Sequence, residues 1–201
     1  LSRAANTVKT QLPDHTLRII GGNWRGRKVS FANEEAVRPT PSRVRETLFN
    51  WLQGYVPGAR CLELYAGSGI LSIEALSRGA GKVVLLDKKE EVISHLSKQF
   101  KDFLVPDQQY KLINQPAGPW LAETKCPGFD LIFLDPPFAG SDLGPILNDI
   151  SAKNLAKPGG WIYIESSSEF QKAQLPGGWI IHRQKRAGAV HYCLCKSLPI
   201  S

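Results

Sequence analysis

Between residues 61 and 165 the sequence alternates between short apolar runs and amphipathic stretches, and this alternation constrains the fold most. The apolar runs predict strands at residues 61–65, 82–87, 110–115, 129–135 and 161–165. Helices are predicted at residues 70–78, 88–104 and 143–156. Strands that alternate with helices form a parallel sheet with helices on both faces. We therefore expect an α/β fold.

The two ends of the chain follow different patterns. Residues 17–20 and 26–31 predict two short strands around a glycine turn. A helix to residue 52 should follow, with Thr40 as its N-cap and Pro41 at its first position. Residues 179–185 and 190–196 predict an antiparallel hairpin that completes a seven-stranded sheet. We expect residues 1–53 to form an amino-terminal extension and residues 54–201 to form the main domain.

The chain carries a net charge of +7, and its basic residues concentrate at the two ends. Residues 1–53 carry +5 and residues 178–201 carry +4, whereas the middle carries −2. Basic surfaces attract the phosphates of nucleic acids. The charge alone fits a solvated surface equally well, so RNA binding depends on the two ends meeting in space.

Several protein classes do not fit this sequence. No apolar run approaches the roughly 18 residues of a membrane span, and residues 1–14 are polar, unlike a secretory signal. The four cysteines show no metal-binding spacing, so we expect reduced thiols, no metal and a cytoplasmic protein. Cys193 and Cys195 are expected on opposite faces of one strand.

A glycine loop, residues 66–69, follows the first strand of the main domain. Glycines at positions 67 and 69 let the backbone approach a ligand closely, and the next helix offers free N–H groups. A nicotinamide dinucleotide site would have a third glycine where Ser72 stands. The loop therefore indicates a nucleotide-like cofactor, with a tight structural turn as the alternative.

Asp87 ends the second strand, 18 residues after Gly69. An acidic residue at this place can accept hydrogen bonds from both ribose hydroxyls of an adenosine. It can also serve as the N-cap of the helix that begins near Lys88.

The fourth strand ends in Asp135-Pro136-Pro137-Phe138. Two prolines stop the strand and leave backbone carbonyls without local N–H partners. A carboxylate beside a free carbonyl makes a double acceptor, which suits the two hydrogens of an exocyclic amine. Such a pair can aim the amine's lone pair at a methyl sulfonium, and Phe138 offers a ring on which the base can stack. The alternative is a proline-stiffened turn.

Together these motifs resemble S-adenosylmethionine-dependent methyltransferases that modify exocyclic amines. The flanking segments resemble the RsmD family in particular, over roughly residues 17–196. The segments that carry this resemblance are Arg18-Ile-Ile-Gly-Gly22, Arg25-Gly-Arg27, Arg38-Pro-Thr40, Arg43-Val-Arg-Glu46, Leu48-Phe-Asn-Trp-Leu52, Glu74-Ala-Leu-Ser-Arg-Gly79 and Ala187-Gly-Ala-Val-His-Tyr192.

The resemblance implies a Rossmann-like methyltransferase fold and methylation of N2 of one guanine, guanine-966, in bacterial 16S rRNA. The cofactor would be S-adenosyl-L-methionine, which leaves as S-adenosyl-L-homocysteine, with no metal. Asp135, Pro136, Pro137 and Phe138 would be catalytic. The implied cofactor-binding residues are Glu63, Tyr65, Ala66, Gly67, Ser68, Gly69, Asp87, Lys88, Asn114, Gln115 and Asp135.

The implied partner is 16S rRNA within the assembled small ribosomal subunit. The protein itself is expected to be a monomer. A guanine within folded RNA must be bare or flipped out to reach Asp135. The residues expected to contact RNA are Arg18, Arg25, Arg27, Lys28, Arg38, Thr40, Arg43, Arg183, Lys185 and Arg186.

Three other interpretations remain open. The chain could methylate DNA adenine N6 or a protein glutamine, although DNA enzymes usually carry a further segment that reads bases, and a glutamine enzyme needs no basic ends. It could be a non-enzymatic RNA-binding module on a methyltransferase fold. It could also be a mitochondrial or plastid relative, because residues 1–11 are basic and lack acids.

Overall fold

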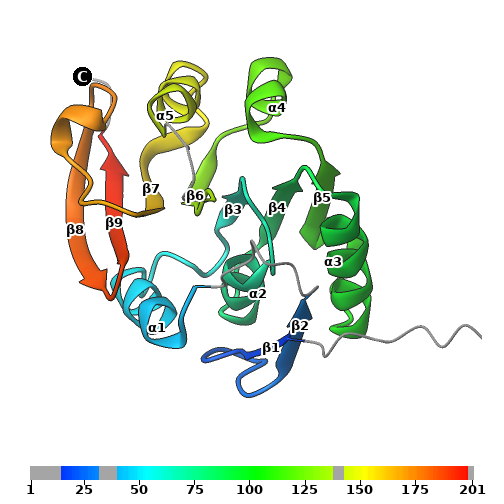
Figure 1. The fold of residues 1–201 in the computed structure, drawn as a ribbon. Coiled ribbons are helices and arrows are strands. Elements are labelled where there is room, and N and C mark those ends of the chain that lie inside the picture. Colours follow the sequence, from blue (N-terminus) through cyan, green and yellow to red (C-terminus); the bar gives the residue numbers. More distant parts are fainter. Residues whose placement is uncertain (1–14, 32–39, 138–142, 199–201) are drawn as a thin grey trace, which may run out of the picture.

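The computed structural model describes residues 15–31, 40–137 and 143–198, and within them a seven-stranded sheet forms the centre of the protein (Figure 1). The strand order is β5-β4-β3-β6-β7-β9-β8, and only β9 runs antiparallel to its neighbours β7 and β8. The strands are β3 (Arg60–Glu63), β4 (Lys82–Asp87), β5 (Tyr110–Asn114), β6 (Phe129–Leu134), β7 (Ala156–Ser166), β8 (Trp179–Ala187) and β9 (Val190–Ser197). The predicted α/β class, with a Rossmann-like sheet, is confirmed.

Helices cover both faces of this sheet. The first face packs against α1 (Ser42–Trp51), α2 (Ile70–Ser77), α3 (Glu90–Asp102) and a hairpin of β1 (His15–Arg18) and β2 (Lys28–Phe31). The second face packs against α4 (Ala117–Glu123) and α5 (Leu143–Ala152). Two short 3-10 helices, Asp107–Gln109 and Lys172–Gln174, lie in connections. Helix α4 was not predicted. Gly118 and Pro119 disfavour a helix in general, but both lie in the first turn of α4, where proline is tolerated.

Alternate residues of each strand point to opposite faces and build two cores. In β4, Val83 and Leu85 join the core beside α1–α3, whereas Val84 and Leu86 join the core beside α4 and α5. The expectation for Cys193 and Cys195 is therefore wrong. Residues two apart in a strand share a face, and the two buried thiols lie with their Sγ atoms 3.7 Å apart.

The order of the strands reverses beside β3. The chain runs outward through β3, β4 and β5 and then returns to place β6 on the other side of β3. Parallel strands that diverge in this way leave a crevice at their carboxyl ends, where ligands bind in open α/β sheets. The fold therefore points to the ends of β3 and β6 as the candidate site.

The β1–β2 hairpin docks on the end of α2. The backbone N–H of Asn23 donates to the Ser77 carbonyl at 2.7 Å, and that of Trp24 donates to the Ser77 hydroxyl at 2.9 Å. Gly22 has a φ of +75°, and a Cβ there would collide with the Ser77 carbonyl group. Only glycine satisfies both conditions without strain.

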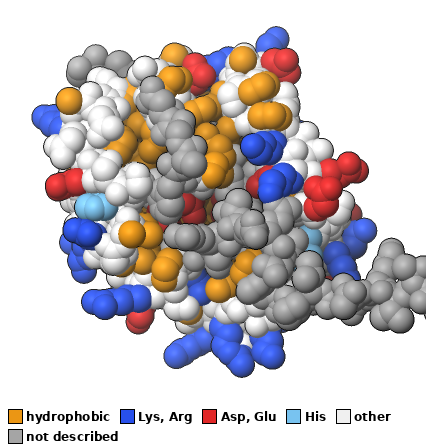
Figure 2. Space-filling view, in the orientation of Figure 1, with side chains coloured by type: hydrophobic (Ala, Val, Ile, Leu, Met, Phe, Trp, Pro, Cys, Tyr) orange, Lys and Arg blue, Asp and Glu red, His pale blue; other side chains and the backbone are white. Residues whose placement is uncertain are grey.

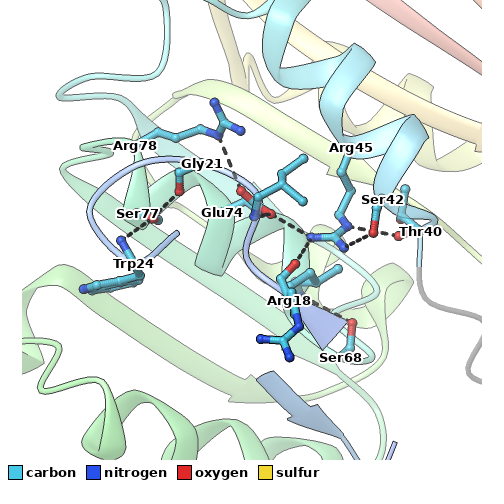
Figure 3. Close-up of polar contacts among 12 residues, drawn as sticks. Arg18, Gly21, Trp24, Thr40, Ser42, Arg45, Ser68, Glu74, Ser77 and Arg78 are labelled. Carbon is cyan, nitrogen blue, oxygen red and sulfur yellow. Dashed lines mark hydrogen bonds and ion pairs between the residues drawn. The ribbon is translucent and has the colours of Figure 1, made fainter. Parts of the chain in front are cut away.

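A buried ion pair joins this hairpin, α1 and α2 (Figure 3). Arg45 of α1 and Glu74 of α2 are fully buried, with Nη1 and Oε1 2.7 Å apart. Arg45 also donates to the backbone carbonyls of Arg18 and Thr40, while the N–H of Ile20 donates to Glu74. Burial lowers the pKa of Arg45 and raises the pKa of Glu74. The charge of each residue opposes the shift that burial causes in the other.

The start of α1 corrects the predictions for both Thr40 and Pro41. Pro41 occupies the cap position, and its carbonyl accepts from the N–H groups of Val44 and Arg45. Thr40 is not the N-cap; its hydroxyl instead donates to Glu165 in β7, at 2.8 Å. The described part of residues 1–53 shares the first core with the sheet, while the division at residue 53 stays a prediction.

We expect Arg45→Met to lower the free energy of unfolding by about 3 kcal/mol, because it leaves the Glu74 carboxylate buried without its partner. Arg43→Met, on the exposed side of the same helix, should change it by less than about 0.5 kcal/mol. Urea unfolding of both variants measures the difference. Equal stabilities would show that the ion pair does not hold these elements together.

Candidate functional site

Four carboxyl groups lie at the carboxyl edge of neighbouring strands. Glu63 ends β3, Asp87 ends β4, Asp135 directly follows β6 and Glu165 is the penultimate residue of β7. Residues two positions earlier in these strands, Cys61, Leu85, Phe133 and Tyr163, all belong to the core beside α1–α3. Because side chains alternate along a strand, the four carboxyl groups point to that same face.

Asp87 fixes the glycine loop from the neighbouring strand. Its Oδ2 accepts the N–H of Gly67 at 3.0 Å, and its Oδ1 accepts the N–H of Lys89 at 3.0 Å. The N–H of Ala66 donates to the Leu86 carbonyl, which ties the loop to the same strand. The carboxylate therefore links the loop to the start of α3, and each oxygen retains capacity for a further hydrogen bond.

The backbone of the loop favours glycine at two positions, and at one of them the packing also excludes a side chain. Gly67 and Gly69 have φ angles of +48° and +66°, and a Cβ on Gly69 would collide with the Leu96 side chain. Ser68 is buried, and its hydroxyl accepts the N–H of Ile70 at the start of α2. A backbone held in this shape can approach a nucleotide-like ligand closely.

The other predicted cofactor residues surround this loop and the end of β4. Asn114 is exposed; its side-chain amide donates to the Asp87 carbonyl, and the Gln115 backbone N–H donates to the same oxygen. Tyr65 is partly buried, which raises its pKa, and Lys88 is exposed. Asn114 and Gln115 therefore both lie at the end of β4, beside Asp87.

Asp135 lies next to the loop, where the sheet diverges. The ladder of β6 ends with Leu134 paired to Ile164, and the two prolines follow Asp135. Asp135 is partly exposed, Pro136 is buried and Pro137 is exposed. Phe138 lies outside the described residues.

Sequence reasoning missed a buried network beside Asp135. Glu165 is 2% exposed, and its Oε1 accepts the hydroxyls of Thr40 and Tyr163, each at 2.8 Å. Thr40 also faces the Asp135 carboxyl group, where it lowers the pKa of Asp135. The signal in the sequence was a Glu at the end of an apolar strand, the same pattern that identified Asp135.

Burial dominates the electrostatics of these carboxyl groups. It raises the pKa of Asp135 well above its ordinary value, and the nearby Glu165 and Glu63 raise it further. Burial also raises the pKa of Glu165, against the hydrogen bonds from Thr40 and Tyr163. Burial raises the pKa of Glu63 to about 8, although the N–H of Ser72 donates to its carboxyl group.

The site suits a ligand that carries positive charge or donates hydrogen bonds. No Lys, Arg or His among the described residues contributes to the pKa shifts of Asp135, Glu165 or Glu63. The described residues contain no group of His, Cys, Asp and Glu arranged to hold a metal ion. None of their helices has both the length and the apolar character needed to cross a membrane.

Most of the predicted RNA-binding residues lie in two exposed basic regions. Figure 2 shows Lys and Arg side chains along the hairpin at the bottom and along the β8 edge at the left. The exposed members are Arg18, Arg25, Arg27, Lys28, Arg43, Arg183, Lys185 and Arg186. Helix α1 contacts both regions, because Arg45 donates to the β1 backbone and Lys185 lies 6.0 Å from the Trp51 ring. The two basic ends are thus joined by α1.

Some of these residues already have protein partners. Arg27 lies 3.9 Å from the Phe103 ring centre and donates to the Asp102 carbonyl. Thr40 is 2% exposed and its hydroxyl is bonded to Glu165, so a contact with RNA would require that bond to break. Arg38 lies outside the described residues. The RNA contacts of all these side chains stay predictions.

Comparison with known proteins gives a consistent family match. Residues 17–196 match the family described as "Conserved hypothetical protein 95". The chain is 39% identical to ribosomal RNA small subunit methyltransferase D of Haemophilus influenzae, across 93% of this chain and 97% of that protein. The solved structure of yhhF, a methyltransferase candidate of Escherichia coli, is 36% identical with a TM-score of 0.82, covering 92% of this chain and 99% of that one.

A more distant likeness concerns the fold alone. The Thermus thermophilus 16S rRNA guanine-N2 methyltransferase RsmC, solved with AdoMet and guanosine, is 19% identical, with a TM-score of 0.65. The match covers 92% of this chain and 50% of that protein.

The raised pKa of Glu63 predicts a pH-dependent stability. The folded carboxyl group holds its proton up to about pH 8, whereas an ordinary glutamate loses it near 4.5. The folded state therefore binds more protons between these values, and stability falls as pH rises, by up to about 1.4 kcal/mol per pH unit for this group. Glu63→Gln should remove this part of the slope.

Urea unfolding across this pH window measures the slope. The exposed Glu123→Gln is the matched control and should retain the slope of the wild-type protein. A Glu63→Gln slope equal to that of the wild-type protein would contradict the assignment.

Proposed function

The chain belongs to the RsmD family of rRNA methyltransferases, and we propose that it methylates the exocyclic N2 amine of guanine-966 in bacterial 16S rRNA. The methyl donor would be S-adenosyl-L-methionine, and the substrate would be the assembled small ribosomal subunit. The protein would act on it as a monomer. The observation that carries this proposal is the position of Asp135 and Pro136, at the divergence of β3 and β6 beside the glycine loop.

The residues at the edge of β3, β4 and β5 fit the cofactor. Backbone at Gly67 and Gly69 would lie along its methionine part, and Asp87 would accept hydrogen bonds from its ribose. Asn114 or Gln115 would meet the adenine. Asp135 and Glu63 have no cationic neighbour, so a positively charged ligand would stabilise their ionised forms. When bound, the cofactor supplies an electrophilic methyl group on a cationic sulfur.

Asp135 and the Pro136 carbonyl would orient the guanine amine. The lone pair of this nitrogen is delocalised into the base, so the free amine is a poor nucleophile. Two acceptors that each take one N–H bond hold the nitrogen closer to tetrahedral and direct its lone pair toward the methyl group. The Asp135 carboxylate also stabilises the positive charge that develops on the amine.

Two further observations favour guanine in rRNA over DNA adenine or a protein glutamine. The first is that the relative at 39% identity is named for small-subunit rRNA. The two exposed basic regions joined by α1 would contact the phosphates around the target base. The guanine would leave its stack to reach Asp135.

We expect Asp135→Asn to reduce methyl transfer at least about a hundredfold, because one acceptor becomes an amide without charge. Asp130→Asn, an exposed carboxylate at the start of the same strand, should retain transfer within about threefold. The assay follows labelled methyl groups from S-adenosylmethionine, with unmodified small subunits, naked rRNA, duplex DNA and protein offered in parallel.

The position of the label decides between the candidate substrates. Label on guanine-966 N2 of the small subunit, lost in Asp135→Asn, supports the proposal. Label only on DNA or protein would retain the fold and overturn the substrate. Cofactor binding without transfer to any substrate would favour a non-enzymatic RNA-binding module.

We also expect the basic regions to act through phosphate contacts. Arg25→Gln in the hairpin and Arg183→Gln in β8 should each weaken binding of the small subunit and lower the salt slope of binding by about one. Lys125→Gln, exposed after α4 on the other face of the sheet from the hairpin, should change neither. Filter binding at several salt concentrations measures these slopes. Equal effects from all three variants would contradict specific phosphate contacts by the two basic regions.

A further inference from the structure

A buried chain of hydroxyl and carboxyl groups lies behind Asp135 and has no part in the mechanism above. Thr40, Tyr163 and Glu165 are each no more than 2% exposed. The hydroxyls of Thr40 and Tyr163 converge on the same oxygen of Glu165, at 2.8 Å each. Thr40 stands between Glu165 and Asp135, because its hydroxyl bonds to the first and faces the second.

The elements around this chain are fixed by the fold. Leu134 pairs with Ile164, so Asp135 and Glu165 follow at the same level of adjacent strands. Thr40 directly precedes Pro41, the cap residue of α1, and its carbonyl accepts a hydrogen bond from Arg45. The ionisable groups that face the two carboxyl groups are Glu63 from β3, Tyr163 from β7 and Tyr192 from β9. All of these groups are acidic.

A buried carboxyl group with two donated hydrogen bonds is costly if it only fills space. Replacing such groups by apolar residues of similar size is often neutral or stabilising. Methyl transfer, in contrast, needs a group that takes a proton, because the amine nitrogen gains a bond and must lose one hydrogen. Asp135 contacts the amine in the proposed function, and Glu165 is the next carboxyl group along the hydroxyl of Thr40.

We propose that Thr40 and Glu165 form a proton relay that receives, through Asp135, the proton lost by the methylated amine. This inference rests on the proposed function. The N–H bond of the amine breaks and an O–H bond forms on Asp135. The Asp135 proton then moves to the Thr40 oxygen while the Thr40 proton moves to Glu165. The amine loses one proton, Glu165 gains one, and Thr40 is unchanged.

The relay gives Thr40 and Glu165 opposite effects on Asp135. The charge of Glu165 raises the pKa of Asp135, whereas the nearby Thr40 hydroxyl lowers it. In the cofactor-free protein, Glu165→Gln should therefore move the titration midpoint of Asp135 down by about one pH unit. Thr40→Val, which retains the shape but removes the hydroxyl, should move it up by a similar amount.

Carbon NMR of protein labelled at aspartate carboxyl groups measures these midpoints, and Asp135→Asn identifies the signal. Thr40→Ser restores the hydroxyl and should return the midpoint to the wild-type value. Glu169→Gln, an exposed carboxyl group after β7, is the matched control. Shifts in the same direction for Glu165→Gln and Thr40→Val, or no shift in either, would overturn the relay.

Single-turnover methyl transfer gives the second measurement. At pH values above the titration midpoint of Asp135, Glu165→Gln and Thr40→Val should each slow methyl transfer by at least about tenfold. Thr40→Ser should restore the wild-type rate. Wild-type rates in both variants would overturn the relay while leaving the proposed function intact. No transfer by the wild-type protein, with the NMR shifts as expected, would reject the proposed function instead. If Glu165→Gln does not fold, the comparison of Thr40→Val with Thr40→Ser decides the test.

Discussion

The Arg45–Glu74 ion pair is the interaction on which the arrangement of the site depends. A guanidinium group with no exposed surface must bind acceptors in every direction, and Arg45 takes them from three separate segments. These contacts set where α1 begins, and hence where Thr40 lies. Thr40 in turn lies beside Glu165 and Asp135, so an ion pair outside the candidate site positions groups within it.

The two-residue period of the strands explains why the site is acidic on one face. Glu63, Asp87, Asp135 and Glu165 come from four strands and share one orientation because each stands an even number of residues after a core residue of that face. Shared burial then raises the pKa of Glu63, Asp135 and Glu165. The glycine loop adds backbone N–H groups at the same edge, one of which binds Asp87.

Much of this could be predicted from the sequence, because the signals were local. Apolar runs predicted most strands to within about two residues, and β4 matched at both ends, since a polar residue or a glycine bounded most of these runs. The exception is β7, which begins at Ala156, five residues before the predicted start and inside the predicted helix. Helix α4 was missed because Gly118 and Pro119 contradict the helix preference of their neighbours. Thr40 was predicted as a cap, although its hydroxyl turns instead to Glu165, 125 residues away. Contacts at such separations depend on the register of whole strands, which no local pattern specifies.

The docking of the hairpin on α2 bears on how proteins of this kind can diversify. Gly22 meets the Ser77 carbonyl without a side chain between them, and Ile20 shares Glu74 with Arg45. The hairpin is therefore not a detachable recognition module that could be exchanged between homologues as a cassette. If the hairpin contacts RNA as proposed, new specificity would arise by substitution of its outward side chains, such as Arg25, while the inward face stays constant.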